Sequence, residues 1–150
     1  MNQVDLSVIP PTARLLGYAG VLPFAALALA HVFGNAAISG HALRSFLAYS
    51  AVILSFLGGI RWGVATRFEP SQAGALVISV LPGLWAFACL LWPDPGVAVW
   101  GLLLGFMTLG MADWLRPAPG SAAWMIGLRV RLSFAVVACH VVLIVSLIAS

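Results

Sequence analysis

The sequence predicts an all-α membrane protein, folded as a compact bundle of about five transmembrane helices. Hydrophobic residues make up 63% of the 150 residues and charged residues only 7%, whereas soluble domains carry roughly 25% charged residues. The apolar residues lie in long runs, and a helix that crosses a membrane needs about 20 of them. We therefore expect one integral membrane domain over residues 1–150.

The first two runs are bounded by turn-forming and charged residues. The first follows Pro10 and Pro11 and ends before Gly34 and Asn35. A cleaved signal peptide has an apolar core of only about 7 to 15 residues, so we expect this longer run to be a retained helix. The second run begins near Arg44, and we expect these two helices over about 13–33 and 44–67.

Three more runs follow, each separated by proline. Ser71 follows Glu69 and Pro70 and is placed to cap the third helix. Asp94 and Gly96 belong to the turn before the fourth. These helices are expected over about 71–92, 97–115 and 129–149, with a long connection before the last. Pro23 and Pro82 fall inside predicted helices, where proline removes a backbone donor, so each predicts a bend.

The arginines predict how the helices are threaded. With five spans, one side of the membrane receives six of them: Arg14, Arg61, Arg67, Arg116, Arg129 and Arg131. The other side receives only Arg44. Positively charged flanks stay on the cytoplasmic side, so we expect the N-terminus inside and the C-terminus outside. The arginines form no single basic face, which argues against a nucleic-acid partner despite the net charge of +3.

A cluster of small and interfacial residues marks the second predicted helix: Ala51, Ser55, Gly58, Gly59, Arg61, Trp62 and Gly63. Positions 51, 55, 59 and 63 recur at a spacing of four, which puts small residues along one helix face. Another backbone can approach such a face closely. We expect packing within the chain, with a dimer or partner surface as the alternative, and we expect Gly59→Leu to disrupt assembly.

Arg61 and Asp113 reach similar depth in this arrangement. The helical rise of about 1.5 Å per residue places Arg61 about 26 Å below Arg44 and Asp113 about 27 Å below Pro95. A buried pair between the second and fourth helices is one interpretation, and it would orient the helices. The other is that both side chains simply reach headgroup water.

His31 and His140 lie inside apolar runs, where imidazole invites a haem or metal interpretation. Their depths differ by about 13 Å, counted at 1.5 Å per residue, which argues against a shared metal. We expect no metal or cofactor. His140 is expected to be a neutral ring bonded to a neighbouring helix, with a proton-relay role as the alternative. His31 is also a candidate for a polar outer mouth together with His41, Arg44 and Tyr49.

Catalytic motifs are absent from the sequence. We find no nucleotide-binding loop, paired carboxylates, zinc spacing or serine-centred triad, so we expect no enzyme. Cys89 and Cys139 lie within apolar runs without metal-ligand spacing and are expected to be buried hydrophobic residues. Most tryptophans fall near predicted helix ends, where indole anchors a helix in the headgroup region.

Three stretches carry a family resemblance: LLGYAGVLPFAALALA, YSAVILSFLGGIRWGVA and LRVRLS. Together with Asp113 and Trp124, they resemble the uncharacterised transmembrane protein 69 family. The resemblance implies a small multi-pass protein of bacteria or of the mitochondrial inner membrane, and it transfers no activity. We place this chain in the bacterial inner membrane.

Two functions follow as expectations. The first is an accessory or interaction protein that packs against lipids, other membrane proteins or a second copy of itself. The alternative is a small carrier or channel with a polar pathway near His140, Arg61 and Asp113, for which a hydrated cavity would have to join these residues.

Overall fold

The computed structural model describes residues 9–67, 73–117 and 122–149, and within these ranges it is helical without strands. The helices are α1 (Pro11–Ala19), α2 (Leu22–Phe33), α3 (Ala36–Ala65), α4 (Ala73–Leu90), α5 (Pro95–Leu115) and α6 (Ala123–Ala149). Because α1 and α2 form one broken span, the described residues contain five segments that are long and apolar enough to cross a membrane. The predicted all-α membrane bundle is confirmed.

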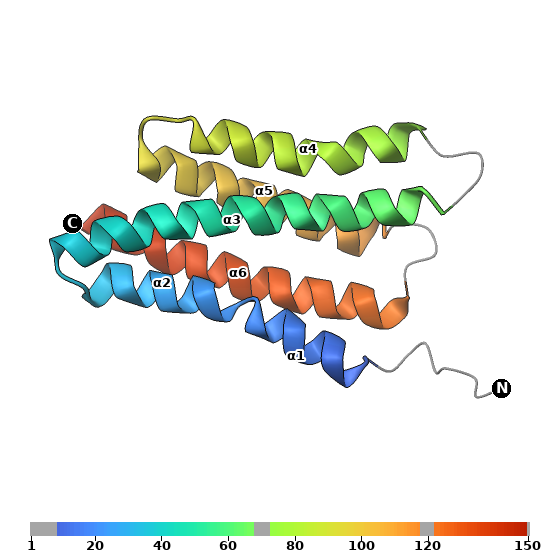
Figure 1. Cartoon of the computed structure of the whole chain (residues 1–150), viewed down its shortest axis with the longest axis horizontal. Helices are drawn as coiled ribbons and strands as arrows, with labels where there is room; N and C mark the ends of the chain where they lie inside the picture. The colour runs from blue at the N-terminus through green and yellow to red at the C-terminus, as the bar shows by residue number, and fades with distance from the viewer. Residues whose placement is uncertain (1–8, 68–72, 118–121, 150) are drawn as a thin grey trace.

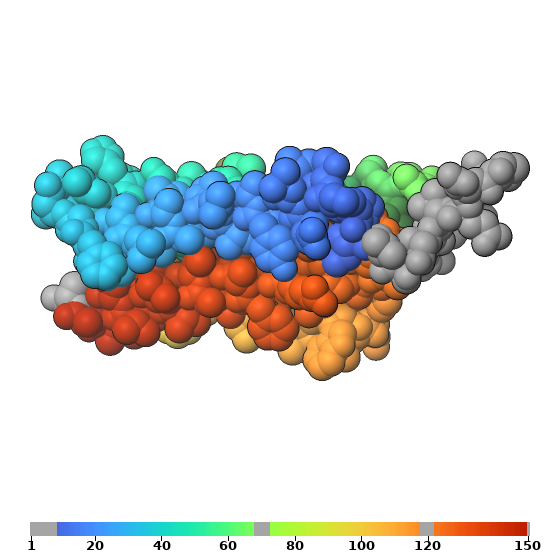
Figure 2. All heavy atoms as spheres, turned by 90° about the horizontal axis from the view of Figure 1, so that it is seen from below, coloured from blue at the N-terminus to red at the C-terminus, as the bar shows by residue number. Residues whose placement is uncertain are grey.

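The spans run alternately up and down along one common axis (Figure 1). In that view α4 lies at one side of the bundle and α1 with α2 at the other, while α3, α5 and α6 lie between them. From below, α1 and α2 lie along α6 (Figure 2). Because five spans are an odd number, α1 begins at one end of the bundle and α6 ends at the other.

The outer surface of the bundle is apolar. Large hydrophobic side chains such as Leu15, Phe33, Phe134 and Ile148 are each more than 65% exposed. Soluble monomers rarely expose contiguous apolar surface of this kind, and here the exposed side chains cover several helices. Lipid is therefore the solvent that fits this surface.

Helix caps explain where the observed helices differ from the predicted ones. The side chain of Asn35 accepts a hydrogen bond from the backbone N–H of Ile38 at 3.0 Å, so α3 begins at Ala36 rather than near residue 44. Asp94 accepts from Gly96 N–H at 2.7 Å and starts α5 at Pro95. The last helix begins six residues earlier than predicted, which shortens the connection before it. The predicted cap Ser71 lies outside the described residues.

The first span is interrupted at Gly20 and Val21, where the sequence predicts only a bend at Pro23. Proline at the start of α2 has no N–H to donate backwards, which fits a helix start better than a helix interior. The hydroxyl of Tyr49 on α3 donates to the carbonyl of Gly20 at 2.9 Å. Tyr49 therefore satisfies a backbone acceptor at the break.

We expect Tyr49→Phe to lower the stability of the bundle by about 1 kcal/mol, because it leaves this carbonyl without its partner. Tyr18→Phe is the matched control, since Tyr18 is 45% exposed on α1. Thermal unfolding of both variants in one detergent checks the expectation. Equal midpoints for the two variants would show that the Gly20 contact contributes nothing.

α3 and α4 approach each other closely at Gly58. A Cβ atom at this position would lie 2.5 Å from the carbonyl oxygen of Ser79 and 3.4 Å from the ring of Pro82. In contrast, a Cβ at Gly59 or Gly63 would meet nothing within 4 Å. The prediction that Gly59 and Gly63 pack within the chain is therefore wrong, and Gly58 is the residue that lets the helices meet.

The core lies where α2, α3, α5 and α6 meet. Phe24 is fully buried, and its ring contacts those of Phe46 and Phe106 edge to face, with centroids 5.4 and 5.9 Å apart. Leu54 and Leu102 are fully buried in the same hydrophobic cluster. Such aromatic contacts add specific geometry to apolar burial. These contacts join α2, α3 and α5, and the fully buried Leu143 of α6 belongs to the same cluster.

Candidate functional site

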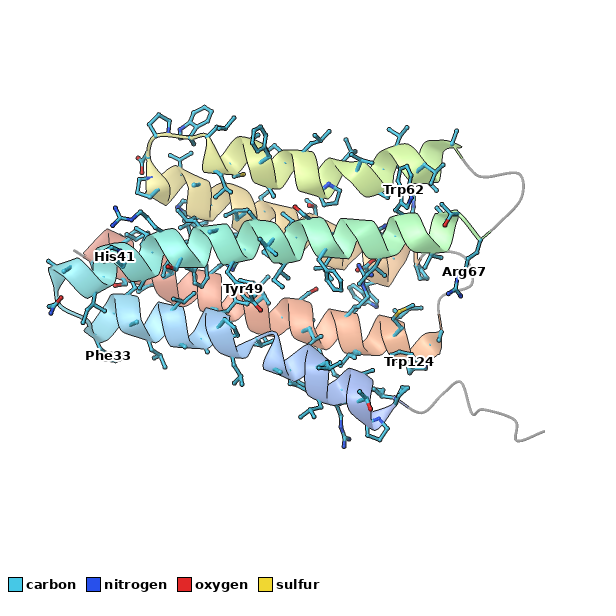
Figure 3. All side chains as sticks on the ribbon, viewed as in Figure 1. Phe33, His41, Tyr49, Trp62, Arg67 and Trp124 are labelled. Atoms are coloured by element: carbon cyan, nitrogen blue, oxygen red, sulfur yellow. The ribbon has the colours of Figure 1, made fainter. Side chains whose placement is uncertain are left out.

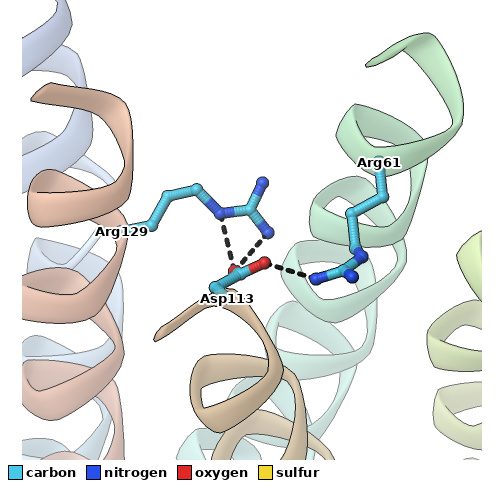
Figure 4. Close-up of polar contacts among 3 residues, drawn as sticks. All are labelled: Arg61, Asp113 and Arg129. Carbon is cyan, nitrogen blue, oxygen red and sulfur yellow. Dashed lines mark hydrogen bonds and ion pairs between the residues drawn. The ribbon is translucent and has the colours of Figure 1, made fainter. Parts of the chain in front are cut away.

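Three charged side chains meet near one end of the bundle (Figure 4). Nη1 of Arg61 on α3 donates to Oδ1 of Asp113 on α5 at 2.6 Å, and Nε of Arg129 on α6 donates to Oδ2 at 2.8 Å. All three side chains are no more than 15% exposed. The structure thus brings Arg61 and Asp113 together, as one of the two interpretations expects, and it adds Arg129 as a second partner.

This ionic cluster (Arg61, Asp113 and Arg129) is not electrically neutral. Two guanidinium groups face one carboxylate, so the cluster carries a net charge of +1. Nη2 of Arg129 lies within ion-pair distance of Oδ2, at 2.6 Å, but it is not aligned for a hydrogen bond and has no other partner within the described residues. The cluster therefore has donor capacity left over, and an anion is the ligand that such a site favours.

Arg61 also lines a groove between α4 and α5. The groove has a volume of about 640 Å³ and is lined by Arg61, Ile78, Leu81, Pro82, Leu84, Trp85, Ala88, Leu104, Gly105, Thr108, Leu109 and Ala112. Figure 1 shows the cause, since α4 and α5 are joined closely at one end and diverge toward the end where α3 finishes. Ile78, Leu81, Leu84 and Leu104 lie near the middle of their helices and are each more than 50% exposed, so the groove opens sideways from the bundle.

Arg61 is the one charged residue in this lining, and it supplies the hydrogen-bond donors that remain available to a ligand there. The indole N–H of Trp85 already donates to the carbonyl of Gly101 at 2.7 Å, which ties α4 to α5. The hydroxyl of Thr108 already donates to backbone carbonyls of its own helix. The groove is therefore an apolar slot with a guanidinium group at one end.

The opposite side of the ionic cluster is nearly closed. A cavity bordered by Arg61, Asp113 and Arg129 has a volume of only about 10 Å³, which is roughly the space that one water molecule needs. Arg61 is reached from the α4–α5 groove, whereas Arg129 also lines another cavity, of about 190 Å³, that borders α1, α2 and α3.

His140 lies in the core, apart from the ionic cluster. It has no exposed surface, and its ring centroid is 4.7 Å from that of Phe46 and 5.3 Å from that of Phe106. Its Nδ1–H donates to the carbonyl of Val136 at 2.9 Å, because a carbonyl can only accept. Its Nε2 lies 3.4 Å from the hydroxyl of Ser50 on α3, which donates its own proton to the carbonyl of Phe46 at 2.7 Å. His140 therefore contacts a neighbouring helix, and it lines neither the groove nor the cluster.

The polar residues of the expected outer mouth take separate partners. Nδ1 of His31 lies 2.8 Å from Oγ of Ser39, which ties α2 to the start of α3. His41 contacts Arg44 on its own helix at 3.5 Å, and Tyr49 bonds to Gly20. Figure 3 shows His41 at one end of α3 and Arg67 at the other. These residues form helix contacts rather than one shared site.

Small residues on α5 face the other helices. A Cβ at Gly101 would meet Sγ of Cys89 at 2.6 Å, and one at Gly105 would meet Leu54 at 2.6 Å and Trp85 at 3.0 Å. Ala51 is buried on α3, and Ser55 bonds to its own helix. Both cysteines are free thiols, with Cys89 buried and Cys139 half-buried.

A family model described as "Protein of unknown function (DUF3429)" matches residues 9–145, which include all three residues of the ionic cluster. The chain belongs to the DUF3429 family. The resemblance to transmembrane protein 69 is also confirmed, since transmembrane protein 69 of Xenopus tropicalis is 34% identical over 129 residues. This alignment covers 83% of the present chain, and the chain spans about half the length of that relative. No solved structure matches this DUF3429 protein.

Proposed function

We propose that this chain is an accessory protein of the membrane, which holds a hydrophobic membrane component in the groove between α4 and α5. The sideways opening of that groove is the observation that supports the proposal, because a site that faces lipid receives its ligand from the lipid phase. Lipids and other membrane proteins, including a second copy of this chain, are the classes of partner. The proposal assigns no catalysed reaction.

The distribution of arginines supports a location and an orientation for this function. Arg14, Arg61 and Arg129 fall near the end of the bundle where α1 and α6 begin, whereas Arg44 falls near the other end. Arginine-rich flanks stay in the cytoplasm. We therefore propose that the N-terminus lies inside and the C-terminus outside, and we propose the bacterial inner membrane as the location.

A carrier or channel is the competing function. It would require a polar pathway that joins the ionic cluster to His140, but His140 is enclosed by Phe24, Phe46 and Phe106. The groove that reaches Arg61 leads outward to lipid instead. An interaction role fits this arrangement better than transport.

Cysteine labelling tests the two functions against each other. Single cysteines are placed along the groove at Ala112, Thr108 and Trp85, and in the core at Ser50 and His140, in a chain whose Cys89 and Cys139 are replaced by alanine. We expect a water-soluble thiol reagent to label position 112 and progressively less of 108 and 85, with the core unlabelled, because lipid fills the groove. Continuous labelling from position 112 through the core would overturn the interaction function in favour of transport.

A further inference from the structure

We propose that the groove between α4 and α5 binds an anionic phospholipid, whose phosphate pairs with Arg61 and one of whose acyl chains lies along the groove. This inference rests on the proposed function and names the ligand of the same groove. It follows from three properties of the groove: its length, its lining and the placement of its single charge.

The groove is shorter than the hydrocarbon layer of the bilayer. On α5 its lining runs from Leu104 to Ala112, and on α4 from Ile78 to Ala88. At about 1.5 Å per residue these stretches are about 12 and 15 Å long, or about half of the roughly 30 Å hydrocarbon thickness. A transmembrane helix of a partner is about twice as long, so a lipid chain fits the groove better.

The lining fits an acyl chain. Leucines and Ile78 form most of the walls, and Pro82 and Gly105 complete the lining. The polar atoms of Trp85 and Thr108 are already hydrogen-bonded to backbone carbonyls. An apolar chain therefore enters this groove without leaving the indole or the hydroxyl unsatisfied.

Charge complementarity selects an anionic headgroup. Arg61 shares the single carboxylate of Asp113 with Arg129, so the cluster keeps a net charge of +1. Arg61 also lies four residues before the end of α3, near the headgroup level. A phosphate at Arg61 would supply the missing negative charge through charge-assisted hydrogen bonds. The further arginines near this end of the bundle attract anionic lipid to the same leaflet.

The experiment titrates the 150-residue chain in detergent with palmitoyl-oleoyl phosphatidylglycerol or with phosphatidylcholine of the same acyl chains. Native mass spectrometry counts the bound lipid. We expect the wild type to bind the anionic lipid at least about tenfold more tightly, because one hydrogen bond to a charged group is worth about that factor. Arg61→Gln should remove this preference and Arg61→Lys should retain part of it. Arg67→Gln, at an exposed arginine near the same end, should leave it unchanged.

A second pair of variants tests the groove independently of the charge. Thr108→Phe adds a ring inside the groove and leaves the ionic cluster intact, whereas Val145→Phe adds the same ring at an exposed position of α6. We expect Thr108→Phe to weaken binding of phosphatidylglycerol about tenfold and Val145→Phe to leave it unchanged. This pair remains informative even where Arg61→Gln fails to fold.

The outcomes separate the two proposals. Equal binding of both lipids by the wild type, or an undiminished preference in folded Arg61→Gln, would overturn the anionic-lipid site. If Thr108→Phe still lowered binding of both lipids in that case, the groove would remain a site for hydrophobic ligands, as the proposed function states. If Thr108→Phe changed the binding of neither lipid, the groove would be excluded as a lipid site.

Discussion

Gly58→Ala is expected to destabilise the bundle by about 1 to 3 kcal/mol, the usual cost of inserting a methyl group into a packed interface. The added Cβ would lie 2.5 Å from the carbonyl oxygen of Ser79. That oxygen belongs to the backbone of α4, so it cannot move aside as the end of a side chain would. The two helices would have to separate along their contact, and thermal unfolding in a fixed detergent measures the loss.

Gly59→Ala is the matched control, one residue further along the same helix. A Cβ there meets nothing within 4 Å, and alanine favours helix over glycine by about 1 kcal/mol. We therefore expect unchanged or slightly raised stability, and likewise no loss of assembly for Gly59→Leu. If Gly59→Ala destabilised the protein as much as Gly58→Ala, the face that α3 presents to α4 would be wrongly assigned.

Asp113→Asn is expected to cost on the order of 3 kcal/mol, because removing one member of a buried ionic group leaves its partners uncompensated. Here two guanidinium groups would lose their shared carboxylate. Arg129→Gln should cost less, since Asp113 keeps its 2.6 Å contact with Arg61. Denaturant or thermal unfolding of the purified variants measures both losses.

Two controls separate pairing from a general effect of charge. Asp94→Asn removes a carboxylate but keeps an oxygen that can accept from Gly96 at the start of α5, and both residues are good caps. Arg67→Gln removes an exposed arginine. Both variants should unfold near the wild-type midpoint. An equal midpoint for Asp113→Asn and Arg67→Gln would mean that the ionic cluster does not stabilise the protein.

The apolar runs of the sequence were enough to predict the number of spans, because the thickness of the bilayer sets the length that each run needs. The helix starts were harder to predict. α3 begins at Ala36, eight residues before the predicted start, because Asn35 caps it, and a capping side chain looks in the sequence like any polar residue of a turn.

The prediction that positions 51, 55, 59 and 63 share one packing face was wrong for a geometric reason. Four residues advance an α-helix by about 400°, or about 40° beyond a full turn. A stripe that begins at buried Ala51 has therefore rotated by about 80° at Gly59 and about 120° at Gly63. Counted from Ala51 at about 100° per residue, the buried residues Gly58 and Ala65 lie within about 40° of the same face. A count with the correct period would have selected Gly58.

Depth counting brought Arg61 and Asp113 to the same level, but it left Arg129 at the membrane boundary. The reason is the start of α6, which lies at Ala123 instead of residue 129. Those six additional residues move Arg129 inward by about 9 Å. The groove could not be predicted at all, because it depends on the angle between α4 and α5 and on the contact between Trp85 and Gly101.

The break at Gly20 divides the first span into two helices that differ in burial. Within the described residues α2 buries Phe24 and Ala28, whereas α1 buries none of its side chains. Local unfolding begins where few buried contacts oppose it. Amide protons of α1 should therefore exchange with deuterium well before those of α2. In that case α1 opens on its own, without the rest of the first span.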